Sequence, residues 1–255
     1  MGRLKDKVCI VTGVAEAEGI GFGIAKVFAR EGATVVCVVR RPMVFDRVKE
    51  LTEAGHKAIG FVADLSKADE VEGLVDEVLA RFGRVDVLVN NAGGGEGVRG
   101  SLVDITEGGW DKVIDANLKT CMLCSRAVLP SMMERRKGKI VNISSVTGPK
   151  VTIPGSTPYS ASKGAVSAFT RALALDVGEY GITVNAISPG YVETGAFPRE
   201  GDRERIARSV PVKRLGRPEE VGYLALFLST EESDYITGQE IVFDGGNIIQ
   251  EFKIA

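Results

Sequence analysis

The sequence predicts an α/β fold in which a single doubly wound parallel sheet is flanked by helices on both faces. Seven short apolar runs alternate with longer amphipathic stretches, and a glycine-rich turn follows the first run. Most runs are continuously apolar, as expected of parallel strands that are buried on both faces. Because the sequence contains no repeat or linker, residues 1–255 are expected to form one domain.

The seven apolar runs are the expected strands. In chain order they are Val8–Thr12, Thr34–Val39, Ala58–Val62, Val85–Asn90, Lys139–Ser144, Thr183–Ser188 and Glu240–Phe243. Parallel strands are joined by right-handed crossovers, so helices are expected between them.

The amphipathic stretches predict five helices. They are Ile20–Arg30, Lys67–Phe82, Trp110–Arg136, Tyr159–Tyr180 and Glu219–Leu228. Ser66 is a candidate N-cap for the second helix, and Gly181 suits the position just past the end of the fourth. The least regular region is Gly195–Pro211.

The overall composition excludes several classes of protein. The formal net charge is −2, so the chain lacks the basic footprint of a protein that binds nucleic acid. No apolar segment is long enough for a signal peptide or a membrane span, so we expect no membrane partner and a cytoplasmic location.

The four cysteines do not form the pattern of a disulfide framework in a chain of this length. Cys121 and Cys124 make a C-x-x-C, but His56 is the only histidine, which leaves tetrahedral zinc without enough ligands. Their neighbours are apolar, so both are expected to be core residues and no metal site is expected.

The glycine-rich turn joins the first expected strand to the first helix. Gly13, Gly19 and Gly21 let the backbone turn tightly and approach a pyrophosphate, which then rests on amides at the helix N-terminus. The alternative is an ordinary tight turn. The position of the glycines directly after the first strand favours dinucleotide binding.

Tyr159 and Lys163 lie four residues apart in an expected helix, fourteen residues after Ser145. Positions i and i+4 share a helix face, so the phenol and the ammonium are expected in one site. A nearby cation favours the phenolate. We therefore expect Lys163 to lower the pKa of Tyr159 in a partly desolvated site, where the phenol would exchange a proton with a substrate.

These and further motifs give the chain an end-to-end resemblance to the short-chain dehydrogenase/reductases, whose fold is Rossmann-like. In order, the matching segments are Thr12-Gly13 with Gly19-Ile20-Gly21, Asp64-Leu65, Asn90-Asn91-Ala92-Gly93, the set Asn117, Ser145, Tyr159 and Lys163, Pro189-Gly190 with Val192 and Thr194, and Asp244-Gly245-Gly246.

The resemblance implies an NAD(P)-dependent oxidoreductase that transfers a hydride between nicotinamide and a small carbonyl or secondary alcohol. It makes Tyr159 the general acid or base and Ser145 a donor to the substrate oxygen, with Ser144 as a rival. Lys163 would hold the nicotinamide ribose. Asn117 would anchor a water of the proton relay, or else simply interrupt a helix.

The resemblance also implies a set of cofactor-binding residues and a homotetramer. The set is Gly13, Ala15, Gly19, Ile20, Arg40, Asp64, Leu65, Asn90, Tyr159, Lys163, Val192 and Thr194. The tail Asn247–Ala255 is apolar, and such a tail more often covers a neighbouring subunit than hangs free.

The glycine turn departs from the usual family pattern. Five residues, Val14 to Glu18, separate the first two glycines where the family usually has three. The longer turn resembles that of the enoyl-thioester reductase branch, but that branch spaces its tyrosine and lysine by six residues. The four-residue spacing of Tyr159 and Lys163 therefore favours carbonyl chemistry over enoyl reduction.

The end of the second expected strand bears on the choice of coenzyme. NAD enzymes usually place there an acid that binds the ribose diol and repels a 2′-phosphate. Here Val39 is followed by Arg40 and Arg41, which favours NADP(H) unless the arginines are merely solvated. Glu16 and Glu18 count against NADP(H), so NAD(H) remains an alternative.

Three loops are expected to shape the substrate site: Gly94–Gly100, Thr147–Pro158 and Gly195–Val210, the last within a lid over about residues 195–211. The lid carries Arg199, Arg203, Arg205 and Arg208. These arginines suit an anionic thioester, or else a salt-bridged exposed helix. A carbonyl reductase or alcohol dehydrogenase is the leading hypothesis. The alternatives are a 3-oxoacyl-thioester reductase and a non-catalytic dinucleotide-sensing regulator.

Overall fold

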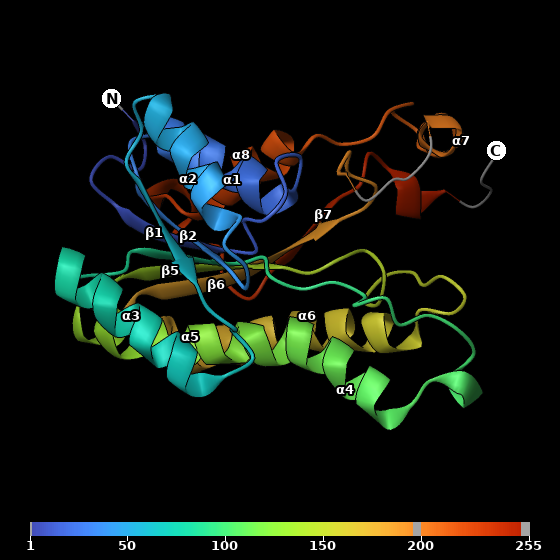
Figure 1. The fold of residues 1–255 in the computed structure, drawn as a ribbon, viewed down its shortest axis with the longest axis horizontal. Helices are drawn as coiled ribbons and strands as arrows, with labels where there is room; N and C mark the ends of the chain where they lie inside the picture. Colours follow the sequence, from blue (N-terminus) through green and yellow to red (C-terminus); the bar gives the residue numbers. More distant parts are fainter. Residues whose placement is uncertain (1, 196–199, 251–255) are drawn as a thin grey trace.

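A computed structural model describes residues 2–195 and 200–250 of the chain. Within them lies a seven-stranded parallel sheet with the strand order β3-β2-β1-β4-β5-β6-β7 (Figure 1). The strands are β1 (Val8–Thr12), β2 (Thr34–Val39), β3 (Ala58–Val62), β4 (Val87–Asn90), β5 (Gly138–Ile143), β6 (Ile182–Pro189) and β7 (Glu240–Phe243). The order reverses between β1 and β4, which is where ligands bind in open sheets of this kind.

Helices cover both faces of the sheet. They are α1 (Ile20–Arg30), α2 (Val44–Glu53), α3 (Ala68–Phe82), α4 (Glu107–Ile114), α5 (Thr120–Glu134), α6 (Thr157–Val177), α7 (Glu200–Ser209) and α8 (Pro218–Leu228). Figure 1 shows α1, α2 and α8 on one face and α3, α5 and α6 on the other. The predicted doubly wound α/β fold is therefore confirmed.

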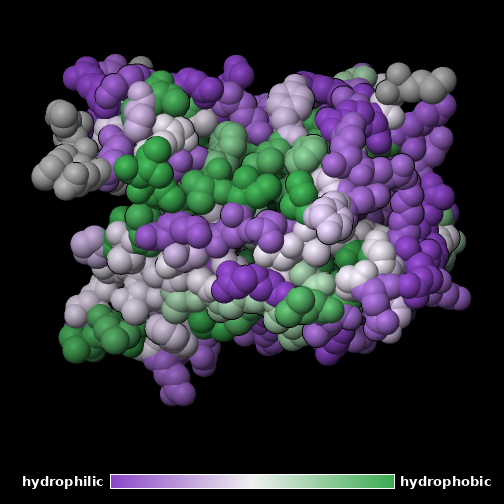
Figure 2. All heavy atoms as spheres, turned by 180° about the vertical axis from the view of Figure 1, so that it is seen from behind, coloured by the Kyte–Doolittle hydropathy of each residue, from purple (hydrophilic) through white to green (hydrophobic). Residues whose placement is uncertain are grey.

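The surface of the described residues is mixed in polarity. Figure 2 shows a band of apolar side chains across the face opposite to that seen in Figure 1, bordered by hydrophilic ones. Across residues 2–195 and 200–250, none of the helices combines the length and the apolar character needed to cross a membrane.

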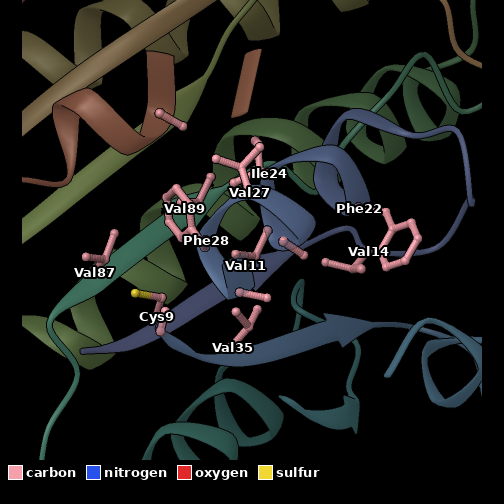
Figure 3. Packing of buried hydrophobic residues seen from close by; sticks show 14 of the residues in the cluster. Cys9, Val11, Val14, Phe22, Ile24, Val27, Phe28, Val35, Val87 and Val89 are labelled. Carbon is pink, nitrogen blue, oxygen red and sulfur yellow. The ribbon is translucent and has the colours of Figure 1, made fainter. Parts of the chain in front are cut away.

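The core has two parts, one on each side of the sheet. Alternate side chains of a strand point to opposite faces, so Cys9 and Val11 belong to the same core cluster as Phe22 and Phe28 of α1 (Figure 3). Ile10, from the same strand, packs on the other face with side chains of α3 and α5. Burial on both faces explains why the strand sequences are continuously apolar.

The expected strands agree with the structure to within two residues at either end, and β1, β2, β3 and β7 agree at both ends. Helix α2 was not predicted. It buries only Val44 and Leu51, and its N-cap residue Met43 makes no side-chain capping bond. Its sequence is nonetheless amphipathic, with Val44, Val48 and Leu51 on one face, so the pattern was present although the helix was not predicted.

The predicted helix Trp110–Arg136 is wrong as a single α-helix. Helix α4 ends at Ile114, a π-helical segment follows at Asp115–Lys119, and α5 starts at Thr120. A π-helical turn contains an additional residue and is often found at functional sites.

The expected N-cap of α3 is also wrong. Lys67 occupies the N-cap position, and the backbone N–H and hydroxyl of Ser66 donate to the Asp64 carboxylate at 3.1 and 2.7 Å. The serine therefore stabilises the turn after β3 instead of the first turn of the helix.

Part of the region expected to be irregular is helix α7. Pairs within the helix join Arg205 to Asp202 and Arg208 to Glu204, as the interpretation of a salt-bridged exposed helix requires. Arg199 lies outside the described residues, as do residues 251–255 of the apolar tail.

Candidate active site

A cleft of about 580 Å³ opens at the carboxyl ends of the strands, over the point where the strand order reverses. The predicted site residues that line it are Gly13, Ala15, Gly19, Ile20, Arg40, Asp64, Leu65, Ser145, Tyr159, Lys163 and Thr194. Residues from several strand ends thus meet in one cavity, which is large enough for an extended organic ligand.

The glycine turn forms one end of the cleft. Gly13 has a φ of +73° and Gly19 is the N-cap of α1. The first intrahelical bond runs from Gly23 N–H to Gly19 O, so the N–H groups of residues 20–22 have no helical carbonyl to bond. This free helix N-terminus suits an anion such as a pyrophosphate.

Asn91 holds the turn against β4. Its side-chain amide donates to the carbonyls of Thr12 and Gly13 at 2.9 and 3.2 Å. A Cβ at Gly21 would lie 2.5 Å from both the Asn91 amide nitrogen and the Gly13 carbonyl oxygen. Only glycine therefore fits at position 21.

We predict that Gly21→Ala weakens coenzyme binding at least about tenfold, because the Gly13 backbone must move away from the added methyl group. Gly73→Ala in α3 is the matched control. Its added Cβ meets no atom of the described chain within 4 Å, so it should raise stability by about 1 kcal/mol. Titration of coenzyme fluorescence and urea unfolding measure the two effects, and equal coenzyme affinity in both variants would contradict the prediction.

Asp64 and Leu65 line the cleft after β3. Hydrogen bonds from Ser66 are the main cause of the lowered pKa of Asp64, and Lys67 and Arg40 add smaller attractions. The carboxylate is thus ionised at neutral pH and fixed in the turn.

Ser144 and Ser145 differ sharply in their surroundings. The Ser144 hydroxyl is buried, donates to the Lys163 carbonyl at 3.0 Å and lies 2.9 Å from the Ser167 hydroxyl. The Ser145 hydroxyl accepts a bond from Thr147 N–H at 3.0 Å and is hydrogen-bonded to Tyr159. Ser145, rather than its rival, is therefore the serine that shares the site with the tyrosine.

Lys163 is buried in the cleft wall. Its ammonium donates to the Ile143 carbonyl at 2.9 Å and lies 5.8 Å from the centre of the Tyr159 ring. Burial lowers the pKa of Lys163 to about 8, and Cys121 opposes this change slightly. The lysine is thus partly neutral in a mildly alkaline solution.

The expected direction of the Tyr159 pKa is wrong for this arrangement. Burial raises the pKa of Tyr159 above that of a free phenol, and the hydrogen bond with Ser145 only partly offsets the rise. The phenolate loses hydration in the cleft wall, and the buried lysine is directed at a backbone carbonyl.

Asn117 lies in the π-helical segment and is 2% exposed. Its side-chain amide donates to the carbonyls of Gly94 and Val113, each at 2.8 Å, and its side-chain oxygen accepts from Gly94 N–H at 3.1 Å. These bonds fix the loop after β4, so the side chain has a structural task.

Asn90 and Val192 are buried behind the cleft wall. The Asn90 amide donates to Asn142 at 2.9 Å and Ser125 at 3.1 Å, which ties β4 to β5 and α5. Val192 pairs with Gly216 in an isolated bridge. Sequence reasoning placed both in direct contact with the cofactor, whereas their neighbours Asn91 to Gly94 and Thr194 line the cleft.

Some cleft residues were not singled out as site residues by the sequence. Glu96 and Lys112 line the cleft beside Arg40, with the Arg40 guanidinium 3.3 Å from the Glu96 carboxylate. The sequence predicts Glu96 only as a residue of a substrate loop. Its pairing with Arg40 could not be predicted from a local pattern, because the two residues lie 56 positions apart.

The cysteines are buried free thiols, as predicted. Burial raises the pKa of Cys121 to about 12 and raises the pKa of Cys124 well above its usual range, so both thiols stay protonated. Among the residues that the structure describes, no cluster of His, Cys, Asp and Glu suits a metal ion.

Comparison with known proteins relates the chain to one enzyme family. Residues 13–247 match the family model described as Enoyl-(Acyl carrier protein) reductase. The chain is 40% identical to the 3-oxoacyl-[acyl-carrier-protein] reductase FabG of Thermotoga maritima, over 97% of this chain and 100% of the relative.

Two solved structures are similar to the chain over its whole length. One is a short-chain dehydrogenase/reductase from Burkholderia xenovorans, with a TM-score of 0.92, 34% identity, and coverage of 98% of this chain and 99% of the other. The second is a variant of the actinorhodin polyketide ketoreductase with NADPH, with a TM-score of 0.89, 36% identity, and coverage of 97% and 99%.

Proposed function

The chain belongs to the short-chain dehydrogenase/reductase family, and from this premise we propose that Tyr159 carries the proton transfer of an NADP(H)-dependent carbonyl reductase. The family membership makes the protein an NAD(P)-dependent oxidoreductase that acts on CH–OH and C=O groups. The observation that supports the proposed site best is the meeting of Ser145, Tyr159 and Lys163 in a cleft that continues to the glycine turn.

The residues of the cleft fit a nicotinamide dinucleotide. The free amides at the start of α1 suit its pyrophosphate, and the absence of a side chain at Gly21 lets the backbone approach closely. Asp64 and Leu65 would contact the adenine, and Lys163 would hold the ribose hydroxyls next to the nicotinamide. The coenzyme, when bound, supplies or accepts the hydride.

Tyr159 would donate a proton to the carbonyl oxygen during reduction and accept it during oxidation. The Ser145 hydroxyl would donate a hydrogen bond to the same oxygen as negative charge develops on it. The Lys163 ammonium would stabilise the phenolate, once it turns from the Ile143 carbonyl toward the ribose and the phenol.

The proton would return to Tyr159 by way of Lys163 and a water near Asn117. Since the side-chain amide of Asn117 is fully used by backbone groups, its main-chain carbonyl is the atom that would hold this water. The π-helical geometry at Asp115–Lys119 supports this role, because it alters the normal pairing of helix carbonyls.

NADP(H) is the proposed coenzyme and NAD(H) the alternative. Arg40 and Arg41 lie at the cleft edge just after β2, where a 2′-phosphate would be recognised. The similar ketoreductase structure contains NADPH. Glu16 also lines the cleft, so the glycine turn retains a competing negative charge.

A 3-oxoacyl thioester is the proposed alternative substrate class. The name of the FabG relative describes a reductase of 3-oxoacyl groups carried by the acyl carrier protein. A second cavity of about 410 Å³ lies beside α7, and Arg203, Lys213, Arg214 and Arg217 contribute cations to it. Glu193 and Glu204 line the same cavity and weaken its attraction for an anion.

A panel of substrates tested with both coenzymes is the decisive experiment. We expect turnover of ketones, aldehydes or an acetoacetyl thioester with NADPH, and faster turnover with NADPH than with NADH. Preference for the thioester over simple ketones would support the alternative substrate class. Tight coenzyme binding without turnover of any carbonyl or alcohol would overturn the proposal in favour of a dinucleotide-sensing regulator.

We further propose that the protein is a cytoplasmic homotetramer. Membership of the family is the ground for this proposal, and a tetramer would cover exposed apolar side chains such as Leu175 on α6 and Tyr223 on α8. The four free thiols suit a reducing compartment. Sedimentation equilibrium of the purified protein tests the oligomer, and a monomer at micromolar concentration would contradict it.

A further inference from the structure

An ion pair spans the adenosine side of the cleft. Arg40 follows β2 and Glu96 lies in the loop after β4, on opposite sides of the central strand β1. The Arg40 Nη2 and Glu96 Oε2 atoms are 3.3 Å apart, and both residues line the cleft. The pair therefore bridges the two strand ends between which the adenosine would lie.

Glu96 is the more firmly held partner. Its side chain is 17% exposed, whereas that of Arg40 is 58% exposed. Lys112 of α4 donates to the Glu96 carbonyl at 3.3 Å and approaches the carboxylate at 3.8 Å. The turn closed by Val98 N–H and Gly95 O keeps the loop in place. These contacts hold the Glu96 carboxylate in position beside Arg40.

The chemistry of the two coenzymes makes this carboxylate selective. A 2′-phosphate needs the Arg40 guanidinium and would have to compete with Glu96 for it. An unphosphorylated ribose has hydroxyl groups that donate hydrogen bonds, and a carboxylate accepts such bonds well. Glu96 therefore opposes the phosphorylated coenzyme and tolerates the other.

We infer that Glu96 is a coenzyme-specificity residue that neutralises Arg40 and lowers the preference for NADP(H) over NAD(H). The inference rests on the proposed function, because it takes Arg40 as the residue that binds the 2′-phosphate. Coenzyme choice would then depend on the loop after β4, which carries Glu96, as well as on the end of β2, which carries Arg40.

The test measures the dissociation constants of NADPH and NADH by coenzyme fluorescence in the intact protein and in Glu96→Gln. We expect the variant to bind NADPH about fivefold more tightly, the factor expected for one partly exposed charge pair, with NADH binding unchanged or weaker. The gain should shrink as salt is raised. Glu134→Gln is the control, since Glu134 lies exposed in the last turn of α5 at the other end of the sheet.

Arg40→Ala separates this inference from the proposed function. We expect it to weaken NADPH binding and to abolish the effect of Glu96→Gln in the double variant. If the intact protein binds neither coenzyme, the proposed function fails. If Arg40→Ala weakens NADPH binding but Glu96→Gln leaves the ratio of the two constants unchanged, only the inference fails. A full effect of Glu96→Gln without Arg40 would also overturn it.

Discussion

Tyr159→Phe is expected to lower the rate of carbonyl reduction by about 1,000-fold while leaving coenzyme affinity almost unchanged. The substitution removes the hydroxyl that would transfer the proton and keeps the ring that fills the cleft wall, and positioned proton transfer typically contributes roughly 100- to 10,000-fold. The partly buried phenol is hydrogen-bonded to Ser145, so its loss also frees that hydroxyl. Single-turnover kinetics with saturating NADPH measure the effect.

Tyr180→Phe is the matched control because Tyr180 lies in the short turn after α6 and does not line the cleft. It should retain the activity of the unaltered protein. If Tyr159→Phe kept near-full activity, the proposed general acid would be wrong, whatever the coenzyme. Reduced activity together with lost coenzyme binding would instead indicate a damaged cleft, and circular dichroism and urea unfolding distinguish that outcome.

Lys163→Met is expected to lower activity by about 100-fold or more and also to change how stability depends on pH. Burial lowers the pKa of Lys163 to about 8 in the folded protein, below the ordinary 10.5. The unfolded chain therefore binds more protons between pH 8 and 10.5, and the free energy of unfolding rises with pH across this window. The full rise is about 3 kcal/mol.

The methionine variant lacks this titration. Its stability relative to the unaltered protein should fall as the pH is raised from about 7 to about 10, even though the bond to the Ile143 carbonyl is lost at every pH. Urea unfolding at several pH values gives the difference. Lys49→Met, at an exposed position of α2, should show no such trend. If the difference in unfolding free energy between Lys163→Met and the unaltered protein did not change with pH, burial would not lower the pKa of Lys163 in the folded state.

The parts of the fold that local sequence determines were predictable. Strands such as β1 and β2 are continuous apolar runs with clear ends, so their bounds follow from the pattern alone. Helix α2 was missed although its short sequence is amphipathic. The π-helical break at Asp115–Lys119 was missed because a segment of five residues is too short for an altered period to be recognised in the sequence.

Some features of the candidate site could likewise be predicted from local sequence, and others depend on tertiary packing. The spacing from Tyr159 to Lys163 places both side chains in one cleft, and this follows from helix geometry. The pKa directions do not follow, because they depend on burial by elements distant in sequence. The ion pair between Arg40 and Glu96 also forms only in the tertiary structure. An arginine at position 40 does not by itself indicate an acidic partner at position 96.

The central position of β1 has a consequence for how the chain folds. Strand β1 is the first in the sequence, yet one of its edges pairs with β4, which begins only at Val87. During synthesis that edge of β1 has no partner until β4 has been made, and the unpaired N–H and C=O groups of a strand edge are a template for aggregation. Because the open sheet is completed through such distant pairings, folding should be slow, and nascent chains that end before β4 should depend on chaperones.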